Sequence, residues 1–189
     1  MKKVDIASFK YTTPLTVDYL NNKKSLKDFY HGFPDIKSFK NQIQEKKSQF
    51  TDDQRNILVK QLNHQYRNIH TTDKVKNNIK LLQDKNTFTV TTGHQLNLFT
   101  GPLYFIYKIV SCLDLADQLQ EKYPDHQFVP IYWMASEDHD FEEISSVFLD
   151  DESIGLKKKA GDAVGRMNLD GFQDAIEELA RKLNPSDHS

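Results

Sequence analysis

Residues 87–102 read Thr87-Phe-Thr-Val-Thr-Thr-Gly-His-Gln-Leu-Asn-Leu-Phe-Thr-Gly-Pro102. The first six positions place four threonines around Phe88 and Val90, and β-branched residues in alternation are typical of a strand. Gly93 then frees the backbone to turn. Pro102 suits the first turn of a helix, where its missing N–H costs nothing. The sequence therefore predicts a strand at 87–92, a polar turn and a helix that begins near Pro102.

That helix is expected to end near Pro124 and to carry a broad apolar face. The face comprises Leu103, Ile106, Ile109, Val110, Leu113, Ala116 and Leu119. Residues 128–134 are nearly all apolar, which predicts a second strand covered on both faces, with pairing from Ile131 because Pro130 cannot donate. A βαβ unit brings the carboxyl ends of its strands to one edge of a sheet. We therefore expect residues 93–95 to lie beside residues 136–140.

Amphipathic patterns before residue 87 predict three helices, which would begin at Asp35, at a Thr51–Gln54 capping box and at Thr72. Residues 147–149 suggest a short strand, residues 157–159 a turn, and residues 172–183 a last helix ended by Asn184-Pro185. The pattern predicts an α/β chain in two parts. Residues 1–86 form a helical N-terminal layer, and residues 87–189 form the first part of a parallel-sheet core.

Composition places the protein in the cytoplasm. The one cysteine among 189 residues excludes an internal disulfide framework, and no apolar run reaches the length of a membrane span. Residues 1–86 carry 17 Lys and Arg against 9 Asp and Glu, whereas residues 87–189 carry 8 against 18. A basic half can bind nucleic acid. We do not expect such a partner, because only two of those 17 residues are arginines.

The turn after the first strand offers candidate ligand groups. Main-chain N–H groups near a helix start bind anions, and the His94 imidazole can add a proton or a hydrogen bond. The other candidates are the neutral side chains and glycines of the turn, namely Gly93, Gln95, Asn97, Thr100 and Gly101. The alternative is that these residues only satisfy the amides of the turn and the helix cap.

Residues 136–140 read Ser136-Glu-Asp-His-Asp140, so that Glu137, Asp138 and Asp140 surround His139. Such carboxylates repel one another unless a cation, a substrate amine or protonation compensates them. The group therefore indicates either a hard-metal site or a pocket for an ammonium group with His139 as general base. The alternative is an exposed acidic helix start. Trp133 is a candidate wall of the pocket, with a place in the sheet core as the alternative.

Residues 92–108 and 130–144 resemble the signature blocks of the bacillithiol-biosynthesis cysteine-adding enzymes, the BshC family. Val164-Gly-Arg-Met167 and residues 25–39 are similar to that family too. The resemblance implies a bacterial ligase that joins the carboxyl group of L-cysteine to the amine of glucosaminyl-malate. It also implies a Rossmann-like, nucleotidyltransferase-like core, with His94 steadying an anionic group and Glu137, Asp138, His139 and Asp140 handling an amine or a metal.

Members of that family are much longer, so this chain resembles their N-terminal portion. The resemblance therefore does not imply that this fragment is active by itself. A homodimer formed through the C-terminal coiled coil of the full-length family is an expected arrangement. The cofactor stays open, with ATP and magnesium as candidates, and we assign no metal ligand. Two rival hypotheses are an RNA-linked module on a synthetase-like core and a metal-dependent hydrolase centred on Glu137–Asp140.

Overall fold

The computed structural model describes residues 5–149, 151–158 and 161–183. The chain divides into two compact units, Met1–Gln54 and Arg55–Ser189. The second unit therefore contains, besides the strands, the whole of the sequence from residue 55 to residue 86. The domain boundary expected at residue 86 stays a prediction.

The first unit is helical. It contains η1 (Ile6–Ser8), α1 (Pro14–Leu20), η2 (Lys24–Phe29) and α2 (Phe39–Gln49). Asp35 does not cap α2 as expected, because its carboxylate accepts from the Ser38 amide at 2.9 Å and so closes the turn that precedes the helix. The Thr51–Gln54 capping box is confirmed, with the Thr51 amide 2.8 Å from Gln54 Oε1 and the Gln54 amide 3.3 Å from Thr51 Oγ1. This box opens α3 (Asp52–Tyr66).

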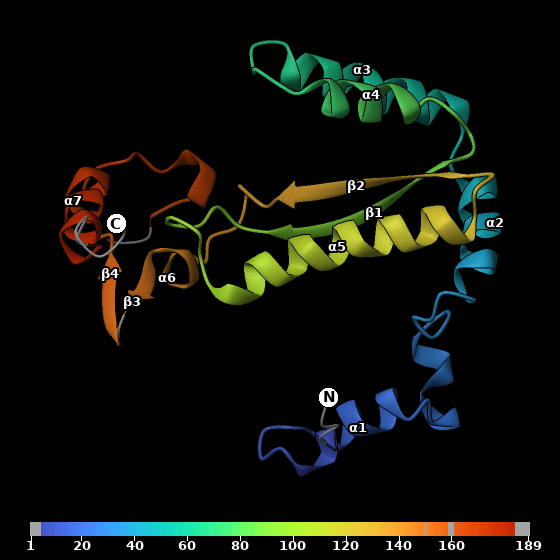
Figure 1. The fold of residues 1–189 in the computed structure, drawn as a ribbon, viewed down its shortest axis with the longest axis horizontal. Coiled ribbons are helices and arrows are strands. Elements are labelled where there is room, and N and C mark those ends of the chain that lie inside the picture. Colours follow the sequence, from blue (N-terminus) through green and yellow to red (C-terminus); the bar gives the residue numbers. More distant parts are fainter. Residues whose placement is uncertain (1–4, 150, 159–160, 184–189) are drawn as a thin grey trace. The chain divides into compact units, whose positions relative to one another are not determined.

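The second unit is built around two parallel strands, β1 (Thr87–His94) and β2 (Gln127–Met134), joined by the helix α5 (Leu103–Lys122). Helix α5 lies along one side of the strand pair, and α3 and α4 (Asp73–Leu81) lie on the other (Figure 1). The core on the α3–α4 side comprises Val59, Ile79, Leu82 and Val129. On the α5 side the Cys112 thiol donates to the Val90 carbonyl at 3.1 Å. The α/β prediction is therefore confirmed.

Strand β2 differs from the expectation in two respects. Pairing runs from Thr87–Gln127 to His94–Met134, so it includes Pro130 and begins four positions before Ile131. A proline is tolerated there because β2 pairs on one side only, within the part of the chain that the structure describes. The strand is also not covered on both faces, since Trp133 is 60% exposed. Trp133 is therefore not a core residue.

The apolar face of α5 is buried only in part. Cys112, Ala116 and Leu119 are buried against the strands, whereas Leu103, Ile106, Val110 and Leu113 are exposed. The broad apolar face that the sequence predicts therefore lies only partly in the core. The physical reason is geometric, because a sheet of two strands is narrower than the apolar stripe of the helix.

After β2 the chain forms α6 (Phe141–Ile144), a hairpin of β3 (Ser146–Leu149) and β4 (Glu152–Gly155), η3 (Val164–Arg166) and α7 (Phe172–Lys182). The short strand and the last helix are thus confirmed. A second core cluster joins Phe141, Ile144 and Val164. Part of the turn expected at 157–159 lies outside the described residues, as do Asn184 and Pro185.

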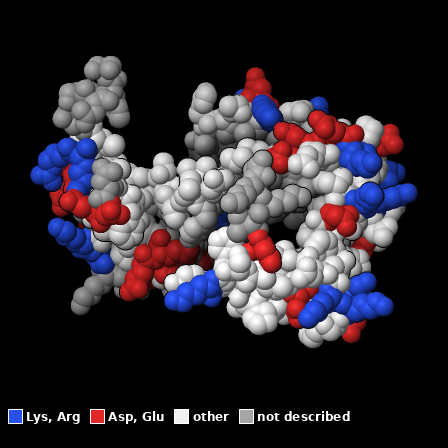
Figure 2. All heavy atoms as spheres, turned by 60° about the horizontal axis from the view of Figure 1, so that its bottom comes forward, with Lys and Arg blue, Asp and Glu red and all other residues white. Residues whose placement is uncertain are grey.

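Charged side chains of both signs are mixed on the face of the molecule that Figure 2 shows. Lys and Arg side chains lie among Asp and Glu side chains there, with uncharged surface between them. None of the described helices has the length and apolar character needed to cross a membrane.

Candidate functional site

The two predicted groups meet at the carboxyl edge of the strand pair. Gly93 stands opposite Trp133 and His94 opposite Met134. The Ala135 amide then donates to the His94 carbonyl at 3.0 Å, which carries the alignment one residue beyond the strands. The expectation that residues 93–95 lie beside residues 136–140 is confirmed at Gln95, whose side chain hydrogen-bonds to Asp138.

His94 is buried at this edge and belongs to a hydrogen-bonded network. Its Nε2 lies 2.8 Å from the Tyr104 hydroxyl and 3.4 Å from Glu143 Oε1. The Tyr104 hydroxyl donates to Glu143 Oε1, and Gln95 Nε2 donates to Glu143 Oε2 at 2.9 Å. The network ties the end of β1 to the first turn of α5 and to α6. Its members from β1 and α5 thus hold the acidic segment against the strand edge.

The network sets the protonation states of two of its members. The Tyr104 hydroxyl and then the Gln95 amide donate to Glu143, and these bonds lower the pKa of that carboxyl below its usual range. The same bond to Glu143, followed by burial, raises the pKa of Tyr104 to about 12. At neutral pH Glu143 is therefore an anion that accepts hydrogen bonds, and Tyr104 is a neutral donor.

In and beside the turn from residue 95 to residue 101, other atoms of the protein pack closely against the glycine backbone. Asn97 Nδ2 donates to the Gln95 carbonyl at 3.1 Å. Gly101 has φ +62°, and a Cβ there would stand 2.7 Å from Asn97 Cγ. A Cβ on Gly93 would stand 3.0 Å from the Trp133 carbonyl oxygen. The two glycines thus allow approach by the protein's own atoms, while the Thr100 side chain stays exposed.

Two of the predicted acidic residues bond to the backbone of their own turn. Asp138 Oδ1 accepts from the Asp140 amide at 2.9 Å, and this bond is the largest cause that lowers the pKa of Asp138. Asp140 Oδ1 accepts from the Glu143 amide at 3.1 Å and so caps α6. These contacts match the alternative of an acidic helix start.

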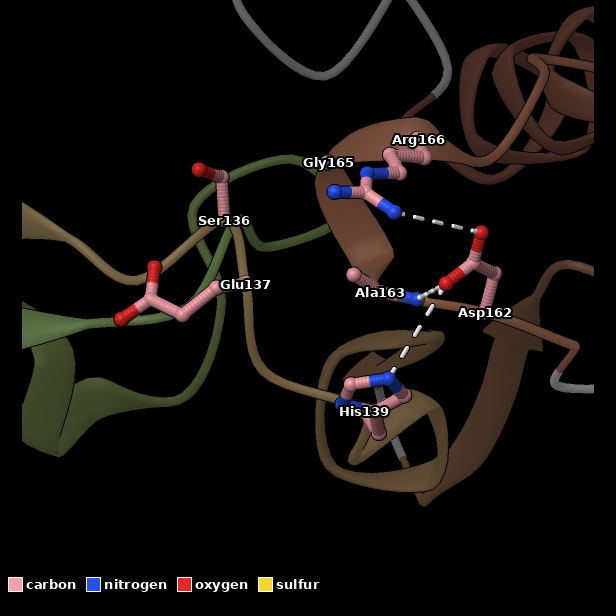
Figure 3. A pocket seen from close by; sticks show the side chains of 7 residues that line it. All are labelled: Ser136, Glu137, His139, Asp162, Ala163, Gly165 and Arg166. Carbon is pink, nitrogen blue, oxygen red and sulfur yellow. Dashed lines mark hydrogen bonds and ion pairs between the residues drawn. The ribbon is translucent and has the colours of Figure 1, made fainter.

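The remaining residues of the segment open onto a pocket of about 340 Å³. Figure 3 shows the side chains that line it, namely Ser136, Glu137, His139, Asp162, Ala163, Gly165 and Arg166. Glu137 Oε1 accepts from Trp133 Nε1 at 3.4 Å, which orients the carboxylate. The Asp162 carboxylate lies between the His139 imidazole and the Arg166 guanidinium, at 4.0 Å from His139 Nε2 and 4.0 Å from Arg166 Nη1.

The far wall of the pocket is η3, which is bonded to the segment after β2. The Val164 amide donates to the Asp138 carbonyl and the Gly165 amide to the Ser136 carbonyl, each at 2.8 Å. A Cβ on Gly165 would stand 2.5 Å from Ser136 Cβ, so only glycine allows this contact. The pocket therefore exists because two segments some thirty residues apart share backbone hydrogen bonds.

Sequence reasoning had not assigned a role to four residues of this region: Tyr104, Glu143, Asp162 and Arg166. Tyr104 lies in the first turn of a helix read for its apolar face, and Arg166 lies in the 164–167 block noted only for its resemblance. Of the predicted residues, Ser136, Glu137 and His139 line the pocket, whereas His94, Gln95, Asn97 and Gly101 form the network and turn beside it.

Among the described residues no group of three or more His, Cys, Asp or Glu side chains is placed to hold a metal ion.

Comparison with known proteins gives a consistent family. The whole chain, residues 1–189, matches the family described as "Bacillithiol biosynthesis BshC, N-terminal Rossmann-like domain". Three similar proteins carry the name "Putative cysteine ligase BshC". The Flavobacterium psychrophilum protein is 50% identical over 95% of this chain and 34% of its own length. The Christiangramia forsetii protein is 46% identical over 95% and 34%. The Bacillus thuringiensis protein is 31% identical over 87% and 32%.

The chain thus spans about a third of the length of the curated relatives that it matches. The match covers both sequence blocks that form the strand edge and the 164–167 block that forms the far wall of the pocket. With a Rossmann-like family description over every residue and identities up to 50%, the chain belongs to the BshC family of bacillithiol biosynthesis.

Proposed function

We propose that the protein takes part in a cysteine ligase reaction, in which the carboxyl group of L-cysteine is joined to the amine of glucosaminyl-malate in an amide bond. The observation that carries this proposal is the pocket beside the strand edge, which combines carboxylates, an imidazole and a guanidinium. Both proposed substrates bear carboxylate and ammonium groups, so a pocket of mixed charge suits them. The family and the name of its relatives support the same reaction class.

In this proposal the amine lies beside His139, and Glu137 stands at the edge of the pocket with its carboxylate turned away from the imidazole (Figure 3). The Glu137 carboxylate, oriented by Trp133, attracts the ammonium form of the substrate. His139 accepts a proton from that nitrogen and so leaves a neutral amine with a free electron pair. Asp162, at 4.0 Å from His139 Nε2, stabilises the imidazolium that results.

The amine nitrogen then attacks the carbonyl carbon of an activated cysteine. A C–N bond forms, and the bond from that carbon to its leaving group breaks, with the electron pair departing on the leaving group. The second proton of the nitrogen is lost to solvent. A free carboxylate does not react in this way, so the cysteine must arrive activated or be activated by a nucleotide such as ATP with magnesium.

The residues of the network position this pocket in our proposal. His94, Gln95 and Glu143 hold the acidic segment at the strand edge, and Asn97, Thr100 and the two glycines shape the turn beside it. Asp138 and Asp140 keep the loop that presents His139 in place. We place the reaction in the cytoplasm.

The test is a calorimetric titration of this chain with glucosaminyl-malate and with L-cysteine, followed by mass spectrometry of the mixture with ATP and magnesium. We expect glucosaminyl-malate to bind and Glu137→Gln to weaken that binding roughly tenfold, equivalent to about 1.4 kcal/mol. Glu142→Gln serves as the matched control, because Glu142 lies in α6 and does not line the pocket.

Product formed by the wild type and abolished in His139→Ala would support the assigned base. Binding of a short RNA with steep salt dependence, and no binding of the amino sugar, would favour the RNA-linked hypothesis instead. Stoichiometric zinc or magnesium uptake that is lost in His139→Ala, again without amino-sugar binding, would favour a metal-dependent hydrolase.

A further inference from the structure

Arg166 is the one Lys or Arg side chain among the described residues that line the pocket. The other ionisable groups of the lining are Glu137, Asp162 and His139. Two carboxylates in a pocket of about 340 Å³ repel an anionic ligand. A ligand that carries both an ammonium and a carboxylate group therefore needs a cation there, and Arg166 supplies it.

The backbone around Arg166 is fixed on several sides. The two preceding residues bond to the segment after β2 through the Val164 and Gly165 amides, and the Arg166 amide donates to the Ala163 carbonyl at 2.8 Å. The Val164 side chain is buried in the cluster with Phe141 and Ile144. The guanidinium therefore extends from a rigid wall of the pocket, as binding groups must if they are to recognise a ligand without a large loss of entropy.

The guanidinium retains most of its hydrogen-bonding capacity. Its one ion pair among the described residues, Arg166 Nη1 with Asp162 Oδ2, measures 4.0 Å. That distance exceeds the length of a hydrogen bond, so Asp162 attracts the guanidinium without using its N–H donors. Figure 3 shows the guanidinium on the side of the pocket where Asp162 and His139 lie, with the Glu137 carboxylate turned away from it. A planar fork of free donors is the group that binds a carboxylate in bidentate fashion.

We propose that Arg166 binds a carboxylate group of the amine-bearing substrate, while His139 and Asp162 receive its ammonium group. This inference rests on the proposed function and assigns the second half of its pocket. It defines the substrate class as an amine joined to a carboxylate, and it makes Arg166 the residue that distinguishes such a conjugate from the bare amino sugar.

The test compares three ligands that share parts of one molecule. Glucosaminyl-malate has the amine and two carboxylates, glucosamine has the amine alone, and malate has the carboxylates alone. NMR titrations of the chain give a Kd for each, in the wild type, in Arg166→Gln and in Arg166→Lys. Arg181→Gln is the matched control, because Arg181 lies in α7 away from the lining residues.

We expect Arg166→Gln to raise the Kd of glucosaminyl-malate and of malate at least tenfold, and to change the Kd of glucosamine by less than twofold. Arg166→Lys keeps the charge without the fork, so its loss should be smaller, and Arg181→Gln should match the wild type. If Arg166→Gln weakens glucosamine binding as much as it weakens glucosaminyl-malate binding, the residue only maintains the fold of the pocket.

The outcomes separate the inference from the proposed function. If the wild type binds glucosaminyl-malate and Arg166→Gln binds it equally well, the inference is wrong and the function stands. If malate binds in an Arg166-dependent way and glucosaminyl-malate does not, the carboxylate site stands and the proposed substrate is wrong. If none of the three ligands binds, both are wrong.

Discussion

The Nε2 atom of His94, at the end of β1, lies 2.8 Å from the hydroxyl of Tyr104 in the first turn of α5. That hydroxyl donates in turn to Glu143, which is 39 positions further along the chain. Tyr104→Phe removes the hydroxyl while keeping the ring. We expect the free energy of unfolding at pH 7 to fall by about 1 kcal/mol, a value reduced for the partial exposure of Glu143. Urea unfolding measures it, with Tyr107→Phe as the control.

The contribution of this pair should also depend on pH in a defined way. The pKa of Glu143 is lowered from its ordinary 4.5, so the contribution is present above pH 4.5 and is lost as the pH falls through the lowered value. The pKa of Tyr104 is raised from 10.0 to about 12, so the contribution is present below pH 10 and is lost as the pH rises toward 12. The difference in stability between wild type and Tyr104→Phe should therefore be largest between pH 5 and 9. A difference that is constant from pH 3 to pH 11 would contradict the network.

Asp140 offers a second test, because its carboxylate caps α6 at 3.1 Å from the Glu143 amide. Asn is as good a cap as Asp, whereas Ala cannot cap. We expect Asp140→Asn to unfold at the same urea concentration as the wild type and Asp140→Ala to lose about 1 kcal/mol. If both variants are equally destabilised, the charge of Asp140 matters and the cap does not.

The exposed part of α5 makes a third prediction. Val110 is 53% exposed although its position in the sequence pattern suggests the core, and Leu119 on the same helix is 1% exposed. Val110→Gln should change the free energy of unfolding of this chain by no more than about 0.5 kcal/mol. Leu119→Ala should cost 2 to 5 kcal/mol, roughly the range for emptying a buried leucine site. A large loss in Val110→Gln would mean that this face of α5 is covered in solution.

Sequence reasoning predicted the βαβ unit and the meeting of the carboxyl ends of its two strands, because strand periodicity and parallel pairing fix both. It could not predict which polar groups bond to one another there. Several polar side chains near this turn could bond to His94 or Glu143, and the position of α6 decides which hydrogen bonds form. Asp162 precedes η3 and Arg166 ends it, and η3 contacts Ser136 through a long-range backbone hydrogen bond that no periodic pattern in the sequence predicts.

Exposure was the other property that the sequence could not supply. The apolar runs in β2 and α5 indicate what these elements would cover if neighbours were present on every side. Trp133 and Leu113 are exposed because, in the described part of this chain, the two-stranded sheet does not extend over them. A pattern of residues thus predicts the direction of a side chain more reliably than its burial.

The contact between Gly165 and Ser136 gives the last prediction. A Cβ at position 165 would stand 2.5 Å from Ser136 Cβ and 2.8 Å from the Ser136 carbonyl oxygen, so the two walls of the pocket must separate to admit it. We expect Gly165→Ala to lower the free energy of unfolding by about 1 to 3 kcal/mol, the usual cost of overpacking. Glucosaminyl-malate binding should weaken at least tenfold in the fraction that remains folded, because the Gly165–Ser136 hydrogen bond that fixes Arg166 is lost. Gly161→Ala is the matched control, since a Cβ there meets nothing within 4 Å. Amide exchange at Gly165, followed by NMR, reports the hydrogen bond directly, and an unchanged protection factor at position 165 in the alanine variant would contradict this account of the pocket.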